Sequence, residues 1–257
     1  MVVALAATEY GDGEPVAILH GLFGSGRNWA SIAQQLGARY RAIAFDLRNH
    51  GTSPWAETID YAAMAEDVHA AMLARGHRRY TLIGHSMGGK VAMVAALGDP
   101  EAVERLVVVD IAPLARPIPY LSYVRAMRAL DLGALSRRRD ADAQLASAIP
   151  DAAERAFLLQ SLDFGDAPPR WRLNLGALEA AMSTLAGFPA WPPGTVYDGP
   201  TLFIAGGRSD AVRPEHEPAI RALFPRAAFT RVEDAGHWVH AERPAEFLAR
   251  VEPFLAG

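Results

Sequence analysis

Ser86 is the residue of this sequence best placed to act as a nucleophile. It sits at the centre of Gly84-His85-Ser86-Met87-Gly88, between an apolar run that ends at Gly84 and a helical pattern that begins at Gly88. A G-x-S-x-G motif in that context places the serine on a sharp strand-to-helix turn with its hydroxyl exposed above a sheet. Small residues are needed at both ends of the motif because larger side chains would collide there. We therefore expect Ser86 to attack an acyl carbonyl.

A serine hydroxyl needs a general base to become nucleophilic at neutral pH. His237 follows the last strand-like run of the sequence directly, within Ala235-Gly236-His237-Trp238. In the chain order Ser, Asp, His, the base occupies that late loop. Two other histidines are weaker alternatives, because His240 is expected on the wall or in the first turn of the last helix and His85 is expected to point away from the reacting face. The sequence therefore predicts His237 as the base.

Two aspartates are candidates for the acid that orients His237. Asp210 lies in Gly207-Arg208-Ser209-Asp210, just after a strand-like run, although Ser-Asp also favours a turn. Asp110 ends the apolar run Arg105–Asp110 and could instead cap the segment that follows. A carboxylate that closes an apolar strand is costly unless a partner pairs with it, which slightly favours Asp110. Both remain candidates at this stage.

A glycine-rich turn is expected to complete the site. In His20-Gly21-Leu22-Phe23-Gly24, which follows another apolar run, the N–H of Leu22 would face the N–H of Met87. Two such donors form an oxyanion hole, and each is typically worth about 3 kcal/mol to the transition state. The glycines fit neither G-x-x-x-x-G-K-[ST] nor G-x-G-x-x-G, so nucleotide binding is disfavoured. Phe23 and Trp238 are the candidates for substrate contacts beside this turn.

The residue types and their spacing give little support for a reaction that depends on a metal or a cofactor. The sequence has no cysteine, so thiolate metal sites, Fe–S clusters and a cysteine nucleophile are excluded. No histidine and carboxylate spacing of the H-E-x-x-H kind occurs, which disfavours a metallohydrolase. We expect no metal and no cofactor. The polar turn from Asp46 to Gly51 is interpreted as structural, with Arg48 pairing Asp46 and Gly51 in a left-handed conformation.

Short apolar runs alternate with helical patterns along most of the chain. Runs that are continuously apolar indicate strands buried on both faces of a parallel sheet, so the alternation predicts a doubly wound α/β fold. The expected strands are Val16–His20, Arg41–Asp46, Tyr80–Gly84, Arg105–Asp110, Thr201–Gly206 and Phe229–Asp234. The expected helices between and after them are Trp29–Leu36, Tyr61–Arg75, Gly88–Leu97, Glu215–Phe224 and Ala245–Leu255.

One stretch interrupts this alternation. Between Pro113 and Pro200 only helical patterns occur, and no run there is a convincing strand. A helical insertion between two late strands predicts a lid over the sheet. The expected organisation is therefore a core domain of residues 1–112 and 201–257 with a lid of residues 113–200.

Composition limits the partners and the compartment. Of the 257 residues 51% are hydrophobic, which is typical of a globular protein. The formal charge of −4 gives no basic surface of the kind that binds nucleic acid. No apolar run approaches the 18 or so residues of a membrane span. We interpret Met1–Ala7 as a first strand and not a signal peptide. A cytoplasmic protein, monomeric or a small homo-oligomer, that acts on a small molecule is expected.

Together these motifs resemble the α/β-hydrolase superfamily, and within it the YbfF-type esterases and the abhydrolase-domain acyl hydrolases. The matching stretches are HGLFGSGRNW at 20–29, DLRNHGTSP at 46–54, GHSMGGKVAM at 84–93, VVVDIAP at 107–113 and AGHWVHAERP at 235–244. The resemblance implies hydrolysis of acyl esters or thioesters without a cofactor, through Ser86 and His237, with Asp110 as the acid. A receptor-like ligand-binding protein, a cofactor-free acyltransferase and a haloperoxidase use the same residue set and remain alternatives.

Overall fold

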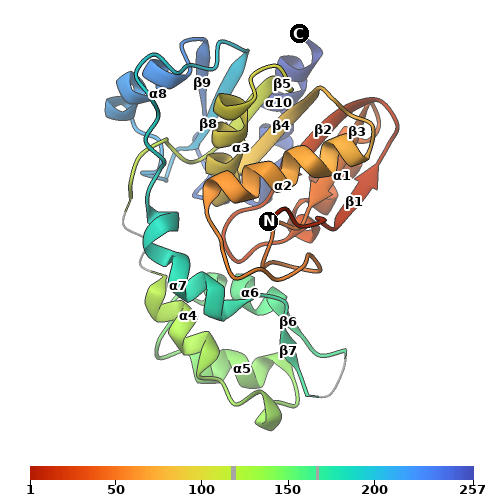
Figure 1. Ribbon diagram of the computed structural model, residues 1–257. Coiled ribbons are helices and arrows are strands. Elements are labelled where there is room, and N and C mark those ends of the chain that lie inside the picture. The colour runs from red at the N-terminus through yellow and green to blue at the C-terminus, as the bar shows by residue number, and fades with distance from the viewer. Residues whose placement is uncertain (117–119, 166–167) are drawn as a thin grey trace.

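The computed structural model describes residues 1–116, 120–165 and 168–257. Within these ranges a sheet of seven strands runs through the upper part of the molecule in the order β1-β3-β2-β4-β5-β8-β9 (Figure 1). Only β1 is antiparallel to its neighbour, and the other paired strands of this sheet are parallel. The strands are β1 (Ala7–Tyr10), β2 (Glu14–Leu19), β3 (Tyr40–Phe45), β4 (Tyr80–His85), β5 (Val103–Val109), β8 (Thr201–Gly206) and β9 (Ala227–Val232).

Helices cover both faces of this sheet. Two separate clusters of buried side chains fill the faces, one beneath α1 and α10 and the other beneath α2, α3 and α8. Every residue of β4 and β8 is buried, as expected for strands covered on both sides. The predicted doubly wound α/β fold with a mostly parallel sheet is therefore confirmed. The helices of this part are α1 (Ala30–Leu36), α2 (Tyr61–Ala74), α3 (Met87–Gly98), α8 (Glu217–Leu223), α9 (Val239–Glu242) and α10 (Pro244–Ala256), with the 3₁₀ turns η1 (Gly26–Trp29) and η4 (Pro214–His216).

The chain between β5 and β8 forms a helical insertion, which lies in the lower part of Figure 1. The expectation that it contains no strand is wrong, because β6 (Leu162–Asp163) and β7 (Arg170–Trp171) form an antiparallel pair. Strands of two residues are too short to produce a recognisable pattern of apolar residues. The helices of the insertion are α4 (Leu121–Arg128), α5 (Arg138–Leu145), α6 (Ala152–Leu158) and α7 (Leu175–Ala186), with η2 (Leu132–Ala134) and η3 (Leu159–Ser161).

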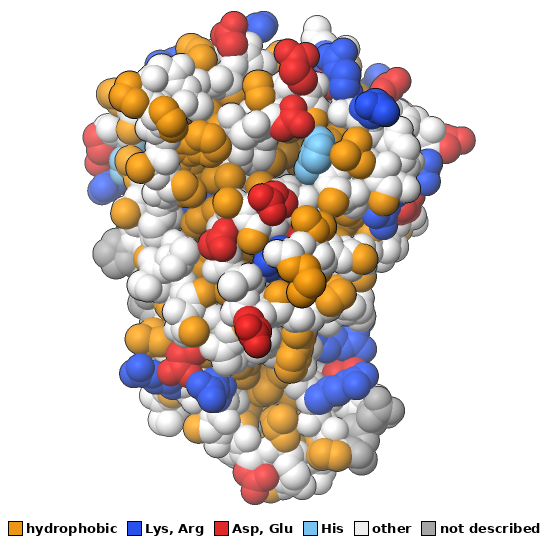
Figure 2. Space-filling view, in the orientation of Figure 1, with side chains coloured by type: hydrophobic (Ala, Val, Ile, Leu, Met, Phe, Trp, Pro, Cys, Tyr) orange, Lys and Arg blue, Asp and Glu red, His pale blue; other side chains and the backbone are white. Residues whose placement is uncertain are grey.

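Basic side chains lie at both sides of the insertion in Figure 2, with hydrophobic side chains exposed between them. Arginines of this region have carboxylate partners. Arg125 donates to Glu179 over 2.9 Å, and Arg172 donates to Asp163 over 2.9 Å. These arginines are therefore held in ion pairs along the insertion. None of the helices in the described ranges is long and apolar enough to cross a lipid bilayer.

The first strand begins later than the sequence suggested. Residues before Ala7 form no strand, and β1 pairs with β3 from Ala7 onward, where Ala7 faces Phe45. The backbone of the preceding segment bonds to side chains instead, since Val3 N donates to Asp67 and Ala6 N donates to Ser53. Ala6 O also accepts the Asp46 N–H over 2.9 Å, so the apolar start of the chain is held by individual hydrogen bonds and not by a strand ladder.

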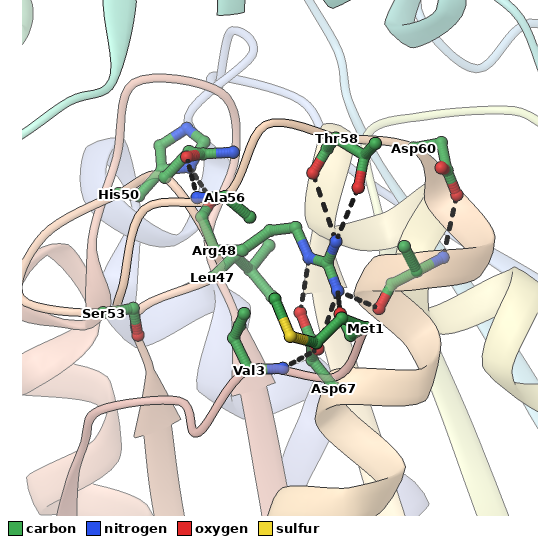
Figure 3. A network of polar contacts seen from close by, with 12 residues as sticks. Met1, Val3, Leu47, Arg48, His50, Ser53, Ala56, Thr58, Asp60 and Asp67 are labelled. Atoms are coloured by element: carbon green, nitrogen blue, oxygen red, sulfur yellow. Dashed lines mark hydrogen bonds and ion pairs between the residues drawn. The ribbon is translucent and has the colours of Figure 1, made fainter. Parts of the chain in front are cut away.

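A buried arginine fixes this start of the chain and the turn after β3 (Figure 3). Arg48 is fully buried and donates from Nε and Nη2 to the two carboxylate oxygens of Asp67, over 2.6 and 2.8 Å. Its Nη2 also donates to the carbonyl oxygens of Ala63 and Met1. A buried bidentate pair with its remaining donors satisfied holds its geometry rigidly.

The expected pairing of Arg48 with Asp46 is therefore wrong. Asp46 instead accepts the backbone N–H groups of Gly26 and Thr52, over 2.7 and 2.8 Å. Gly51 has the expected left-handed conformation, with φ of 59°. A Cβ at this glycine would lie 2.1 Å from an Asp46 carboxylate oxygen, so the turn closes tightly around that carboxylate.

Candidate active site

Ser86 lies in a strained turn between β4 and α3. Its backbone has φ of 52° and ψ of −117°, a conformation that non-glycine residues rarely adopt. The turn brings backbones into close contact, because a Cβ at Gly84 would lie 2.2 Å from the Gly88 oxygen and a Cβ at Gly88 would lie 2.5 Å from the His20 oxygen. Glycine is therefore required at both ends of the motif.

Three side chains from separate loops meet at this turn. His237, in the loop after β9, places its Nε2 atom 3.0 Å from Ser86 Oγ. Its Nδ1 atom lies 2.7 Å from an Asp110 carboxylate oxygen. Each of these residues follows the carboxyl end of a parallel strand, and those ends share one edge of the sheet. The parallel sheet therefore brings together residues that are up to 151 positions apart.

Asp110 is fully buried and well supplied with donors. Beyond His237, its carboxylate accepts the backbone N–H of Gly206 over 2.9 Å and the hydroxyl of Ser209. Its φ is 51°, in the left-handed region that aspartate tolerates better than most residues. Contacts with three different groups therefore fix the position of the carboxylate beside the His237 ring.

Asp210, the other candidate for the acid, does not contact His237. Asp210 is 70% exposed at the rim of the cavity above Ser86, and its carboxylate is paired with Arg116 of the segment that follows β5. The Arg116 guanidinium lowers the pKa of Asp210 below its usual value. Of the two candidate aspartates, only Asp110 contacts His237 in the described part of the chain.

The glycine-rich turn after β2 lies on the other side of Ser86. The carbonyl oxygen of Gly21 accepts the N–H of Gly24 over 3.0 Å and lies 2.8 Å from His20 Nδ1. In a trans peptide the C=O and N–H point in opposite directions, so these bonds set the direction of the Leu22 N–H. Leu22 and Met87 line the same cavity as Ser86.

Two cavities flank Ser86. The larger has a volume of about 300 Å³ and is formed by the core together with the insertion, and the smaller, of about 30 Å³, has mostly aromatic and apolar walls. Of the predicted substrate contacts, Phe23 lines the smaller cavity and Trp238 lines both. The larger cavity is lined by Leu22, Tyr61, Ser86, Met87, Lys90, Ile111, Arg116, Tyr120, Glu154, Leu185, Arg208, Ser209, Asp210, His237 and Trp238.

His85 and His240 are both buried beside the site. The expectation that His85 points away is wrong, because it lines the smaller cavity and its Nε2 lies 2.8 Å from the His237 carbonyl oxygen. His240 stacks on Trp29 with ring centres 3.8 Å apart. Burial, followed by the neighbouring His237, lowers the pKa of both rings, so both are neutral supports for the His237 loop.

Lys90 is a site residue that the sequence reasoning missed. It is almost fully buried on α3, lines the larger cavity, and donates to the carbonyl oxygens of Ala186 and Gly187 over 3.2 and 2.6 Å. Tyr61 binds the preceding carbonyl, that of Leu185, over 2.6 Å. Two core side chains therefore hold the end of α7. The signal for Lys90 is its position four residues after Ser86, in the first turn of α3.

We expect Lys90 to titrate near pH 8. Burial, followed by repulsion from Arg116, lowers its pKa from 10.5 to about 8. Between pH values of about 8 and 10.5, Lys90 is protonated in the unfolded chain and largely deprotonated in the folded chain. The contribution of Lys90 to the free energy of unfolding therefore rises with pH over this range. Since Lys90 is the only lysine of the sequence, protein labelled with [¹³Cε]lysine gives a single side-chain resonance to follow.

The matched variant for this titration is Arg116→Gln, which removes the repelling charge and should move the midpoint upward. A midpoint near 10.5 in the wild type would contradict the expected burial of the ammonium group. An unchanged midpoint in Arg116→Gln would show that burial alone lowers the pKa.

The described residues contain no group of three or more histidine, aspartate or glutamate side chains arranged to hold a metal ion. The contacts at the site join the Ser86 hydroxyl to the His237 ring, and that ring to the buried carboxylate of Asp110.

Comparison with known proteins agrees with this geometry. The sequence matches the alpha/beta hydrolase fold family over residues 14–244. It is 41% identical to mouse sn-1-specific diacylglycerol lipase ABHD11 over 249 residues, covering 94% of this chain and 80% of that protein. It is 33% identical to Esterase YbfF of Escherichia coli strain K12 over 256 residues, covering 98% and 97%. A solved structure described as a marine microorganism esterase has a TM-score of 0.94 at 33% identity, covering 98% of this chain and 99% of that one.

The fold and these likenesses define an α/β hydrolase. The chain belongs to the alpha/beta hydrolase fold family, and its resemblance to the esterases of that family is confirmed.

Proposed function

We propose that this protein is a serine hydrolase that cleaves carboxylic esters through an acyl-enzyme on Ser86. The observation that carries the proposal is the continuous contact from Ser86 Oγ to His237 Nε2, at 3.0 Å, and from His237 Nδ1 to Asp110, at 2.7 Å. The relatives named as a lipase and as esterases support the ester as the substrate class.

In the first half of the reaction His237 Nε2 takes the proton of Ser86 while Ser86 Oγ attacks the acyl carbonyl carbon. Asp110 accepts the Nδ1–H of His237 and stabilises the imidazolium that forms. The N–H groups of Leu22 and Met87 receive the oxyanion of the tetrahedral intermediate. Collapse of this intermediate breaks the ester bond, and His237 protonates the leaving alcohol.

In the second half a water molecule replaces the alcohol. His237 takes a proton from this water, which attacks the acyl-enzyme, and a second tetrahedral intermediate forms with its oxyanion in the same place. Its collapse releases the carboxylic acid and returns the proton to Ser86. Thioesters would follow the same steps with a thiol as the leaving group.

We propose that residues 113–200 form a lid over a core of residues 1–112 and 201–257. Support comes from the larger cavity, whose walls include Ser86 and His237 of the core and Tyr120, Glu154 and Leu185 of the insertion. A volume of about 300 Å³ is at the small end of ligand cavities. Esters with short acyl chains are therefore the expected substrates.

The test is turnover of p-nitrophenyl esters with acyl chains of two to sixteen carbons. We expect an optimum at or below about eight carbons, because the cavity is small. A fluorophosphonate probe should label one residue, and tryptic mass spectrometry should locate it at Ser86.

Two other outcomes would replace this proposal. Labelling of Ser86 without turnover of any ester, together with tight retention of ligand, would indicate a receptor. An added alcohol that is acylated in preference to water would indicate an acyltransferase.

A further inference from the structure

Phe23, in the turn that carries the Leu22 N–H, is held at both of its backbone polar groups. Its N–H donates to His50 Nε2 over 3.3 Å, and its carbonyl oxygen accepts the hydroxyl of Ser161 over 2.9 Å. Its φ is 65°, which a residue with a Cβ adopts at a cost. A costly conformation persists only where its surroundings impose it, and these two bonds supply that constraint.

His50 is arranged to act only as an acceptor toward Phe23. The ring is fully buried, and its Nδ1 lies 2.9 Å from the Arg48 carbonyl oxygen, which can only accept. Nδ1 therefore carries the proton, and Nε2 is free to receive the Phe23 N–H. Burial, followed by repulsion from His20, lowers the pKa of His50 to about 3, so the ring keeps this form at neutral pH.

The insertion contacts the same turn that carries His50. Asn174 donates from its backbone N–H to the Asn49 carbonyl oxygen and from Nδ2 to Asn49 Oδ1, each over 3.0 Å. Leu173 forms a β-bridge with His50. With Ser161 on η3, the insertion therefore bonds both the Phe23 loop and the turn that supports it.

We propose that His50 and Ser161 are positioning residues for the oxyanion hole, so that docking of the insertion completes the catalytic loop. His50 holds Phe23 from the core and Ser161 holds it from the insertion. Between them they keep the adjoining Leu22 N–H aimed at the developing oxyanion. This inference rests on the proposed serine-hydrolase function.

Four variants test this proposal: Ser161→Ala, His50→Ala, His50→Gln and the control Gln160→Ala. Gln160 adjoins Ser161 on η3 and also contacts the core, since its side chain accepts from Asn28 over 2.8 Å, but it makes no bond to Phe23. Glutamine at position 50 keeps an acceptor oxygen near the place of Nε2, whereas alanine removes it.

The readouts are kcat and KM for p-nitrophenyl butyrate and the Ki of a trifluoromethyl ketone, whose serine adduct carries an oxyanion. We expect Ser161→Ala to lower kcat about tenfold and His50→Ala about 100-fold, with KM nearly unchanged, because a misaimed donor loses stabilisation specific to the transition state. The ketone Ki should rise by the same factors. His50→Gln should recover most of the kcat lost in His50→Ala, and Gln160→Ala should match the wild type.

Wild-type kcat and ketone Ki in Ser161→Ala would overturn the proposal, and this variant decides the matter if His50→Ala does not fold. An equal loss in Gln160→Ala would also overturn it, because general docking of the insertion would then explain the effect. A wild type that neither hydrolyses the ester nor forms the ketone adduct would overturn the proposed function and this inference together. Wild-type turnover with unaffected variants would overturn this inference alone.

Discussion

Replacing Ser86 with alanine is expected to lower kcat/KM for p-nitrophenyl butyrate by about 10⁵-fold while the protein stays folded. Loss of the attacking oxygen removes the acyl-enzyme path, and the other members of such a set contribute little without it. The surrounding fold should persist because alanine shares the Cβ of serine and meets the same backbone strain at φ of 52°. Steady-state kinetics and thermal unfolding of both proteins measure the two effects.

The matched control is Ser31→Ala, which removes the same hydroxyl from an exposed serine on α1 that lines neither cavity beside Ser86. It should keep wild-type turnover and fluorophosphonate labelling, whereas Ser86→Ala should lose both. Ester hydrolysis by Ser86→Ala at the wild-type rate would exclude Ser86 as the nucleophile. A folded Ser86→Ala protein with slow residual turnover would still fit, because the oxyanion donors remain in place.

Much of the fold could be predicted because its strands are buried on both faces. Burial on both sides of β4 and β8 demands continuous apolar runs, and such runs are visible in a single sequence. The turn around Ser86 is equally local, since the close backbone contacts of Gly84 and Gly88 require glycine at fixed spacing. Local requirements of this kind can be recognised from the residue types and their spacing alone.

The features that were missed depend on contacts between distant segments. Arg48 pairs with Asp67 and not with nearby Asp46, because the fold of α2 brings the Asp67 carboxylate into the core. Lys90 and Arg116 line a cavity whose walls also include Glu154 and Leu185 of the insertion. No pattern in a single sequence shows where a helical insertion will lie. The residues that the insertion contributes to the cavity walls could therefore not be predicted.

The choice between Asp110 and Asp210 as the acid depends both on local sequence and on contacts between distant segments. Both aspartates follow strands at the same edge of the sheet, so position along the chain did not separate them. The cost of burying an unpaired carboxylate favoured Asp110. In the structure Asp110 is fully buried among three donors, while Asp210 is exposed and paired with Arg116. This difference in burial leads to opposite expectations for the same substitution at the two positions.

Asp110→Asn is expected to lower kcat about 10³–10⁴-fold, and Asp210→Asn to change it by less than about fivefold. At position 110 the new amide would donate to His237 Nδ1, which moves the ring proton to Nε2, where it prevents Ser86 from giving up its own proton. Asparagine tolerates φ of 51° and can still accept the Gly206 N–H, so the loss should come from the tautomer and not from unfolding.

At position 210 only an exposed ion pair is lost, which is worth at most about 1 kcal/mol. The two variants have the same charge change and the same shape change, so each controls for the other. Single-turnover kinetics with p-nitrophenyl butyrate should show slow acylation in Asp110→Asn and wild-type acylation in Asp210→Asn. The reverse pattern would make Asp210 the acid and would require the rim loop to move against His237 during turnover. Equal large losses of kcat in both variants would mean that the ion pair of Asp210 with Arg116 is itself part of the catalytic arrangement.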